Sequence, residues 1–192
     1  MTDIPSHHYI YGLTEDYLTG EQIVDTDDER CRQKIARILV EEKGYDKTDL
    51  IPRLKIETLF SKNFVVSTID LVLLLGGKKF CVLRYGPGSL VTRERPAIAA
   101  ARVLDKTCPI PFAAVTNGQD LEFIDVVNAQ VIGTGFRAMP TKKEGLLKIK
   151  EVSFPAPLSG SQRERELRIL NAYDVELCCA GGPCALPDAP EG

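Results

Sequence analysis

The chain has 192 residues, 44% of them hydrophobic and 27% charged, which is enough apolar surface for one domain with a buried core. Its 24 Lys and Arg against 27 Asp and Glu give a net charge of −3, so the chain is not a polybasic DNA binder, and any contact with nucleic acid must come from a local patch. Two His and no Trp argue against a His-rich metal site and against an aromatic platform for single strands. Because we find no phosphate-loop motif, no apolar leader and no membrane-length apolar run, we expect a cytoplasmic protein without a membrane partner.

The first half of the chain predicts one helix followed by three strands. Residues 1–28 are polar and acidic without sustained periodicity. Over residues 29–44, apolar side chains recur at i, i+4, i+7 and i+8, which predicts a helix that ends near Gly44. Strands are expected at 53–60, 64–75 and 79–85, the last two joined by a turn at Gly76-Gly77. The middle strand is apolar on both faces, which indicates a central position between two layers of helices.

The second half adds a helix, a hairpin and a C-terminal region. A helix is predicted over 92–105, and a strand at 112–116 pairs with 121–126 across a two-residue turn at Asn117-Gly118. The helix between the third and fourth strands permits a crossover that leaves those two strands parallel. The further expected segments are a short helix at 142–151, a Pro-containing linker at 152–160, a helix opened by a Ser161/Glu164 capping box and ending near Tyr173, and a Gly- and Pro-rich tail from Cys178.

This order, helix-strand-strand-strand-helix-strand, is that of the core of the PD-(D/E)xK nucleases. We therefore predict an α/β, restriction-endonuclease-like mixed sheet flanked by helices. In that fold an acid on the second core strand and an E-x-K pair on the third converge, the carboxylates hold Mg²⁺, and the lysine activates the attacking water. Asp70 lies in the middle of the second strand, where an unpaired carboxylate is expensive.

The third strand departs from this chemistry. The two positions expected to carry Glu and Lys hold Val82 and Arg84, which have the right spacing, but valine cannot ligate a metal and arginine cannot act as a base. One interpretation is a structural Asp70–Arg84 ion pair, and the other is that Arg84 binds a phosphate. A two-residue loop at Gly76-Gly77 places Asp70 opposite Leu83, unless a bulge shifts the register by one residue and brings Arg84 opposite Asp70.

Residues 13–140 resemble the N-terminal domain of type I restriction enzyme R subunits, and more closely the small stand-alone proteins grouped with that domain. Each matching segment is weak alone, and their order along one chain carries the resemblance, which implies a PD-(D/E)xK-like fold and nuclease ancestry. The segments are Tyr17-Leu18-Thr19-Gly20-Glu21, residues 25–30, 32–37 and 41–45, Ile69-Asp70-Leu71-Val72, Thr92-Arg93-Glu94-Arg95-Pro96, Ala99-Ala100-Ala101-Arg102 and Val115-Thr116-Asn117-Gly118.

The resemblance also suggests roles for three acids, each with a simpler alternative. Asp70 matches the strand acid and is the expected metal ligand. Glu29 matches the acid that many such nucleases keep on the first helix, although a carboxylate in a first turn also stabilises the helix dipole, which we favour. Glu94 follows the third strand and could replace the missing glutamate, although a charge at a helix start is usually only solvated.

Two further groups carry candidate functions. Basic residues from the turn, the third strand and the second helix could contact phosphates along one rim, or form an ordinary solvated face; besides Arg84, they are Lys78, Lys79, Arg93, Arg95 and Arg102. The tail thiols of Cys178, Cys179 and Cys184 lack the paired spacing of a zinc site and are expected to be adventitious.

We expect a polar segment at 1–28, the nuclease-like domain at 29–140, a linker with helices at 141–177 and a tail at 178–192. Two functions remain open. One is a metal-dependent DNA endonuclease with a rearranged site of Asp70, Glu29 and Arg84. The other, favoured by the missing Glu and Lys, is a relative that binds DNA or a protein partner with weak or no cleavage. We expect no cofactor, apart from Mg²⁺ if the chain cleaves; a homo-oligomer is left open.

Overall fold

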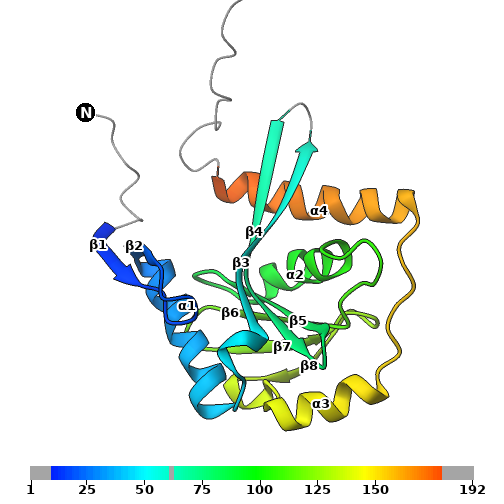
Figure 1. Ribbon diagram of the computed structural model, residues 1–192. Helices are drawn as coiled ribbons and strands as arrows, with labels where there is room; N and C mark the ends of the chain where they lie inside the picture. Colours follow the sequence, from blue (N-terminus) through cyan, green and yellow to red (C-terminus); the bar gives the residue numbers. More distant parts are fainter. Residues whose placement is uncertain (1–9, 61–62, 179–192) are drawn as a thin grey trace, which may run out of the picture.

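A six-stranded mixed sheet lies at the centre of the computed structural model, which describes residues 10–60 and 63–178 (Figure 1). The strands lie side by side in chain order, and neighbours are antiparallel except β5 and β6. These two run parallel and are connected along the chain by the crossover helix α2. The strands are β3 (Leu50–Phe60), β4 (Asn63–Leu75), β5 (Lys78–Tyr85), β6 (Phe112–Thr116), β7 (Leu121–Asp125) and β8 (Gln130–Thr134).

Helices cover both faces of this sheet. On one face lie α2 (Val91–Val103) and α4 (Gly160–Cys178); on the other lie α1 (Asp27–Arg37), a π-helical continuation of it, η1 (Ile38–Glu42), and α3 (Lys142–Glu151) (Figure 1). Two short 3₁₀ turns, η2 (Lys47–Asp49) and η3 (Phe136–Ala138), complete the second layer. The mixed α/β fold is therefore confirmed.

Strand β4 is buried on both faces, as its sequence predicts. Val72 packs among α2 and α4 residues, whereas Leu71 and Leu73 pack against α1 and α3, and all three are fully buried. Helix α2 approaches the sheet closely because its inner face carries small residues, Ala97 and Ala99–Ala101, none of them exposed. Asp70 on β4 and Arg84 on β5 therefore lie on neighbouring inner strands of the sheet.

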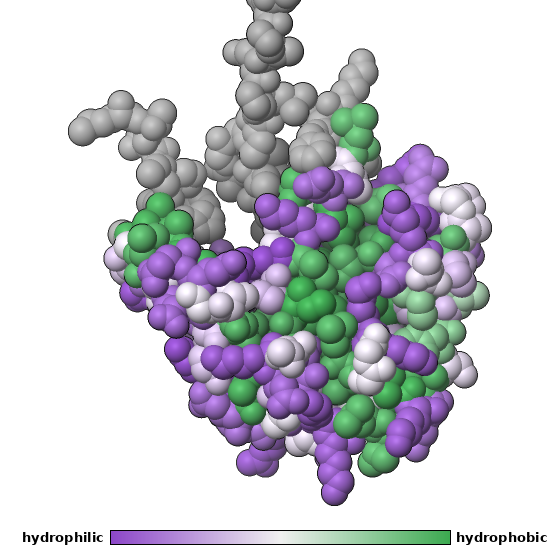
Figure 2. Space-filling model, in the orientation of Figure 1, coloured by the Kyte–Doolittle hydropathy of each residue, from purple (hydrophilic) through white to green (hydrophobic). Residues whose placement is uncertain are grey.

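Several elements differ from the sequence prediction. Residues assigned to a featureless N-terminal segment form a hairpin of β1 (Ile10–Glu15) and β2 (Gln22–Thr26), and β8 adds a sixth strand after β7. The hairpin carries exposed apolar side chains, Ile10, Leu13 and Val24, at the left edge of the space-filling view (Figure 2). Such a two-sided exposed hairpin has no alternation of buried and solvated positions, so periodicity does not reveal it.

One turn prediction and one helix-cap prediction are corrected. Thr116 pairs with Leu121, so the loop at Asn117-Gly118 has four residues, and the Asn117 side chain accepts the backbone N–H groups of Gln119 and Asp120 within it. Helix α4 is capped two residues earlier than expected: Ser159 and Gln162 exchange side-chain-to-backbone hydrogen bonds, in place of Ser161 and Glu164. Cys179 and Cys184 lie outside the described residues.

Candidate functional site

The first turn of α1 carries the acid that reaches the sheet. Thr26 caps the helix by accepting the backbone N–H of Glu29, and Glu29 itself is only 6% exposed. Opposite β4, Arg53 interrupts the regular pairing of β3 with a left-handed backbone (φ 54°), at the position facing Asp70. Helix α1 and this irregularity bring charged side chains from three elements to one place.

Arg32 joins the two predicted acids. Its guanidinium lies 2.9 Å from Asp70 Oδ1 through both Nε and Nη2, while Nη1 donates to Glu29 Oε2. The second oxygen of Asp70 accepts the backbone N–H of Tyr85 at 2.8 Å. Both carboxylate oxygens of Asp70 are thus occupied by donors of the protein itself.

A second arginine extends the cluster towards the N-terminal hairpin. Glu29 Oε1 accepts Gln33 Nε2 at 2.7 Å and lies 3.3 Å from Arg53 Nη1, which also donates to Asp16. Asp16 is 1% exposed and accepts the backbone N–H groups of two residues in the following turn. We call this cluster the Arg32 network; its members are Asp16, Glu29, Arg32, Gln33, Arg53 and Asp70.

Burial sets the electrostatics of the Arg32 network. It raises the pKa of Asp70, because attraction to Arg32, shared with Glu29, offsets the loss of water only in part. Burial also opposes the charge of Arg32, yet its two carboxylate partners hold the pKa of Arg32 above its usual value. For Asp16 burial is outweighed by hydrogen bonds from Thr19, Arg53 and Leu18, so its pKa is lowered.

The family described as type I restriction enzyme R protein N terminus matches residues 27–140. The match covers more than half of the chain, from the first residue of α1 through β8. The chain belongs to this family. Neither the curated proteins nor the solved structures yielded a match. Among the described helices, none is both long and apolar enough to cross a membrane.

The nuclease-like site expected from the sequence would hold Mg²⁺, and the Arg32 network does not fit such a site. Mg²⁺ needs carboxylate oxygens with free lone pairs around an open position. Here an arginine cation lies between Asp70 and Glu29, and within residues 10–60 and 63–178 no three His, Cys, Asp or Glu side chains converge in a way that could hold a metal. The cation that balances these two acids is supplied by the chain.

The predicted ion pair between Asp70 and Arg84 is wrong. A bulge between Leu73 and Leu74 shifts the β4–β5 register by one residue, the possibility left open from the sequence, so that Leu71 pairs with Leu83. The direct partner of Asp70 is nevertheless Arg32 of α1, whereas Arg84 Nη2 donates to Asp174 of α4 at 2.7 Å. The charge of Arg84 is near enough to favour the ionised form of Asp70, but less strongly than that of Arg32. Val82 is fully buried against α2. Asp70 and Arg84 are therefore held by different helices rather than by each other.

Glu94 goes to a different partner. It lies near Glu122 of β7, and burial together with the charges of Glu94 and Asp120 raises the pKa of Glu122. This places Glu94 in a carboxyl pair with β7, so a role as the replacement glutamate beside Asp70 stays a prediction.

The predicted DNA-binding side chains all have partners within the chain. Lys78 lies over the Phe154 ring at 4.8 Å, and Lys79 pairs with Asp105 at 2.5 Å. The other four contact α4: Arg84 pairs with Asp174, Arg93 donates to Tyr173 Oη, and Arg95 and Arg102 share Glu166. Their role in binding DNA stays a prediction, but four of them share one face.

Sequence reasoning missed the partners rather than the acids. Arg32, Arg53 and Asp16 were not singled out, and neither were Glu166 and Asp174 on α4. A signal existed for Arg32, because it follows Glu29 by three residues and so lies on the same side of the helix. Nothing local indicates which strand a helical arginine will meet.

Proposed function

We propose that this protein, as a member of its family, binds DNA without cleaving it. The observation that carries the proposal is the guanidinium of Arg32, which bridges Asp70 and Glu29 where a catalytic cation would need their oxygens.

Hydrolysis by this class of fold needs a metal held by carboxylates and a group that takes a proton from water. The two acids here are neutralised by an arginine, and the position expected to carry the lysine holds Arg84, a residue type that cannot act as a base. Arg84 is also engaged with Asp174. Both requirements are therefore unmet by these side chains.

DNA binding is supported by the local distribution of charge. Although the whole chain is acidic, four arginines from β5 and α2 share the face covered by α4: Arg84, Arg93, Arg95 and Arg102. Guanidinium groups match phosphate oxygens in geometry and keep their charge at all relevant pH values.

An active endonuclease is the second candidate, and one observation favours it. Arg32 bridges two buried carboxylates, those of Glu29 and Asp70. Were Arg32 to swing out when DNA binds, these oxygens would supply the ligand type that Mg²⁺ prefers.

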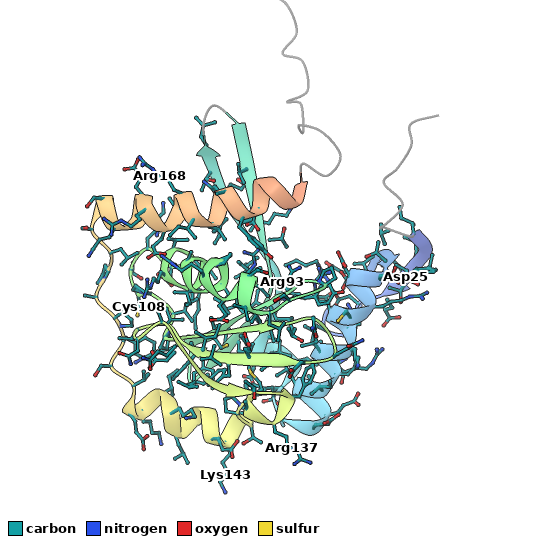
Figure 3. The ribbon with its side chains drawn as sticks, turned by 180° about the vertical axis from the view of Figure 1, so that it is seen from behind. Asp25, Arg93, Cys108, Arg137, Lys143 and Arg168 are labelled. Atoms are coloured by element: carbon teal, nitrogen blue, oxygen red, sulfur yellow. The ribbon has the colours of Figure 1, made fainter. Side chains whose placement is uncertain are left out.

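Two assays of the purified chain test the proposal. Incubation with supercoiled plasmid and Mg²⁺ or Mn²⁺ should give no cleavage, and a DNA duplex titrated at several salt concentrations should bind with an affinity that falls steeply as salt rises. Arg93→Gln should weaken binding and reduce the salt slope by about one counterion. Lys143→Gln, which removes the same charge from the exposed side of α3, should not (Figure 3).

Cleavage that Asp70→Ala abolishes would establish the endonuclease instead. A complete lack of salt-dependent DNA binding would refute the binding half of the proposal and leave a protein partner as the remaining interpretation.

A further inference from the structure

Helix α4 presents a stripe of two carboxylates and one leucine to the domain. Glu166, Leu170 and Asp174 follow each other at i, i+4 and i+8, so they lie on one side of the helix, and each is at most 6% exposed. The opposite side carries the ion pair Glu164–Arg168, both more than 60% exposed, and Arg168 points away from the domain (Figure 3).

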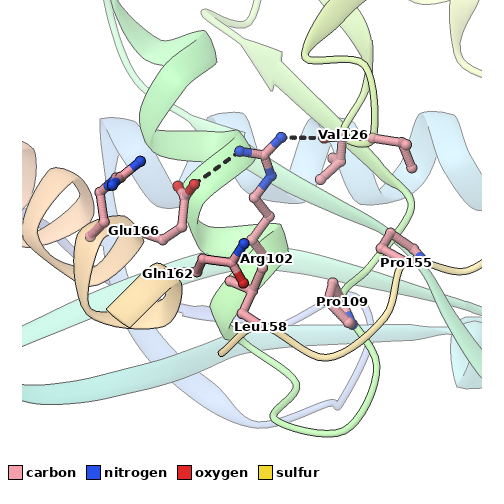
Figure 4. Close-up of a pocket in the computed structure, with 9 residues that line it drawn as sticks. Arg102, Pro109, Val126, Pro155, Leu158, Gln162 and Glu166 are labelled. Carbon is pink, nitrogen blue, oxygen red and sulfur yellow. Dashed lines mark hydrogen bonds and ion pairs between the residues drawn. The ribbon is translucent and has the colours of Figure 1, made fainter. Parts of the chain in front are cut away.

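The two buried carboxylates hold three guanidinium groups. Glu166 lies 2.7 Å from Arg95 and 2.9 Å from Arg102, both on α2, and Figure 4 shows the contact with Arg102. Asp174 lies 2.7 Å from Arg84 of β5. One turn of α4 also supplies Tyr173, whose hydroxyl accepts Arg93 Nη1 at 2.7 Å. We call these four arginines the α4-covered cluster: Arg84, Arg93, Arg95 and Arg102.

The covered cluster is only partly satisfied. Within the described part of the chain, neither Arg84 Nη1 nor Arg93 Nε has a hydrogen-bond acceptor, although both atoms are buried. The cleft between these arginines, Tyr85 and Tyr173 has a volume of about 20 Å³. That is room for about one water molecule and not for a phosphate group. A phosphate, with more acceptor oxygens than one carboxylate, can bind there only when α4 moves away.

The attachment of α4 suits such a movement. Residues 152–159, with Pro155 and Pro157, connect it to α3 without helix or strand, and α4 lies outside the residues that the family shares. The apolar contacts of α4 are made by Leu170, which has no exposed surface, and by the partly buried Leu167 and Ile169, whereas Glu166 and Asp174 contribute ionic contacts. If another anion takes the place of these two carboxylates, the guanidiniums keep a partner and the cost of an unpaired buried charge is avoided.

We propose that the α4-covered cluster is a binding site for the phosphate backbone of nucleic acid, and that α4 occupies it with Glu166 and Asp174 in place of phosphates. Nucleic acid and α4 then compete for the same arginines. This inference rests on the proposed DNA binding and adds where it occurs and what limits it.

The first test removes the competing charges from the full chain. The variant Glu166→Gln/Asp174→Asn should bind a short DNA duplex roughly tenfold more tightly than wild type, within the range of about 5–150-fold usual for coupled sites. Its matched control is Glu151→Gln/Glu164→Gln, which removes two exposed carboxylates and so gives the same net charge. The control should bind DNA as wild type does.

The second test needs no variant. Hydrogen exchange of wild type should become faster across residues 160–178 when the duplex is added. Unchanged exchange there, together with equal affinities of wild type and the double variant, would overturn the inference while leaving the wild-type DNA binding of the proposed function intact. If the double variant shows faster exchange in α4 and yet neither protein binds DNA, both proposals are wrong. Should the double variant not fold, wild-type exchange alone decides.

Discussion

Arg32 is held from two sides by carboxylates that come from the sheet and from its own helix. Its side chain is 15% exposed, and those of Glu29 and Asp70 are 7% and 8% exposed. Truncating one partner of a buried pair leaves an uncompensated charge, which typically costs about 3–5 kcal/mol. We therefore expect Arg32→Ala to lower the free energy of unfolding by about that amount, measured by chemical denaturation.

A surface arginine provides the comparison. Arg168 pairs with Glu164 in contact with solvent. Because exposed pairs contribute at most about 1 kcal/mol, Arg168→Ala should change stability little. Equal, small effects of the two substitutions would mean that the Arg32 network does not contribute to holding α1 on the sheet.

The partner of Arg84 can be measured by a double-mutant cycle. Arg84 lies 2.7 Å from Asp174, whereas Asp70 is bound by Arg32. Arg84→Ala combined with Asp174→Ala should show a coupling energy of about 1–3 kcal/mol, the upper part of the range for contacting residues. The same cycle with Asp70→Ala should give a smaller value. A larger coupling to Asp70 would restore the ion pair expected from the sequence.

Among single residues, the sequence identifies the acids better than their partners. Asp70 is conspicuous because a charge within an apolar strand demands compensation. In the structure Glu29 contacts the same guanidinium as Asp70, that of Arg32. The choice of Arg32 over Arg84 depends on how α1 and α4 pack against the sheet, because Arg32 comes from α1 and Arg84 is engaged by Asp174 of α4. Helix packing is a tertiary feature that local spacing does not contain.

Helix α4 is the element whose docking should depend on pH. Burial alone would raise the pKa of Glu166, but its hydrogen bonds with Arg95 and Arg102 outweigh burial and lower the pKa below the ordinary 4.5. A carboxyl with a depressed folded pKa contributes stability above its unfolded pKa, and that contribution is lost as the pH falls through the folded value.

We therefore expect the stability advantage of wild type over Glu166→Gln to be constant near neutral pH and to shrink as the pH falls below about 4.5. Chemical denaturation of the two proteins from neutral to acidic pH measures this difference. The matched variant Glu164→Gln changes an exposed partner and should follow wild type closely. A difference between wild type and Glu166→Gln that grows on acidification would contradict the assignment.

Elements with a regular pattern were predicted well. β6 and α3 begin and end at the expected residues, because an apolar run between turns and a helix with its own cap are both local signals. The β1–β2 hairpin and β8 were missed, since their side chains are mostly exposed. The docking of α4 was expected from its thin apolar edge, but the charges beside that edge were not seen as its main contacts.

Over the whole molecule, the residues that match the family form the mixed sheet, and the helix beyond them covers its basic face. The matched residues build the sheet, α1 and α2, and within them an arginine takes the position of a cation between two acids. The part beyond residue 140 adds a helix whose carboxylates neutralise the basic face. The charges of the acidic and the basic groups are thus paired within the chain, although Arg84 Nη1 and Arg93 Nε have no hydrogen-bond acceptor among the described residues.

Whether Arg32 occupies the place of a metal ion can be measured by Mn²⁺ binding, followed as the loss of the free-ion signal in electron paramagnetic resonance. Wild type should bind no Mn²⁺ at the Arg32 network, since the guanidinium occupies the oxygens of Asp70 and Glu29. Arg32→Ala, where it folds, should gain a binding site that is lost again in Arg32→Ala/Asp70→Ala. Binding of Mn²⁺ to wild type that Asp70→Ala abolishes would contradict the account and identify a working metal site.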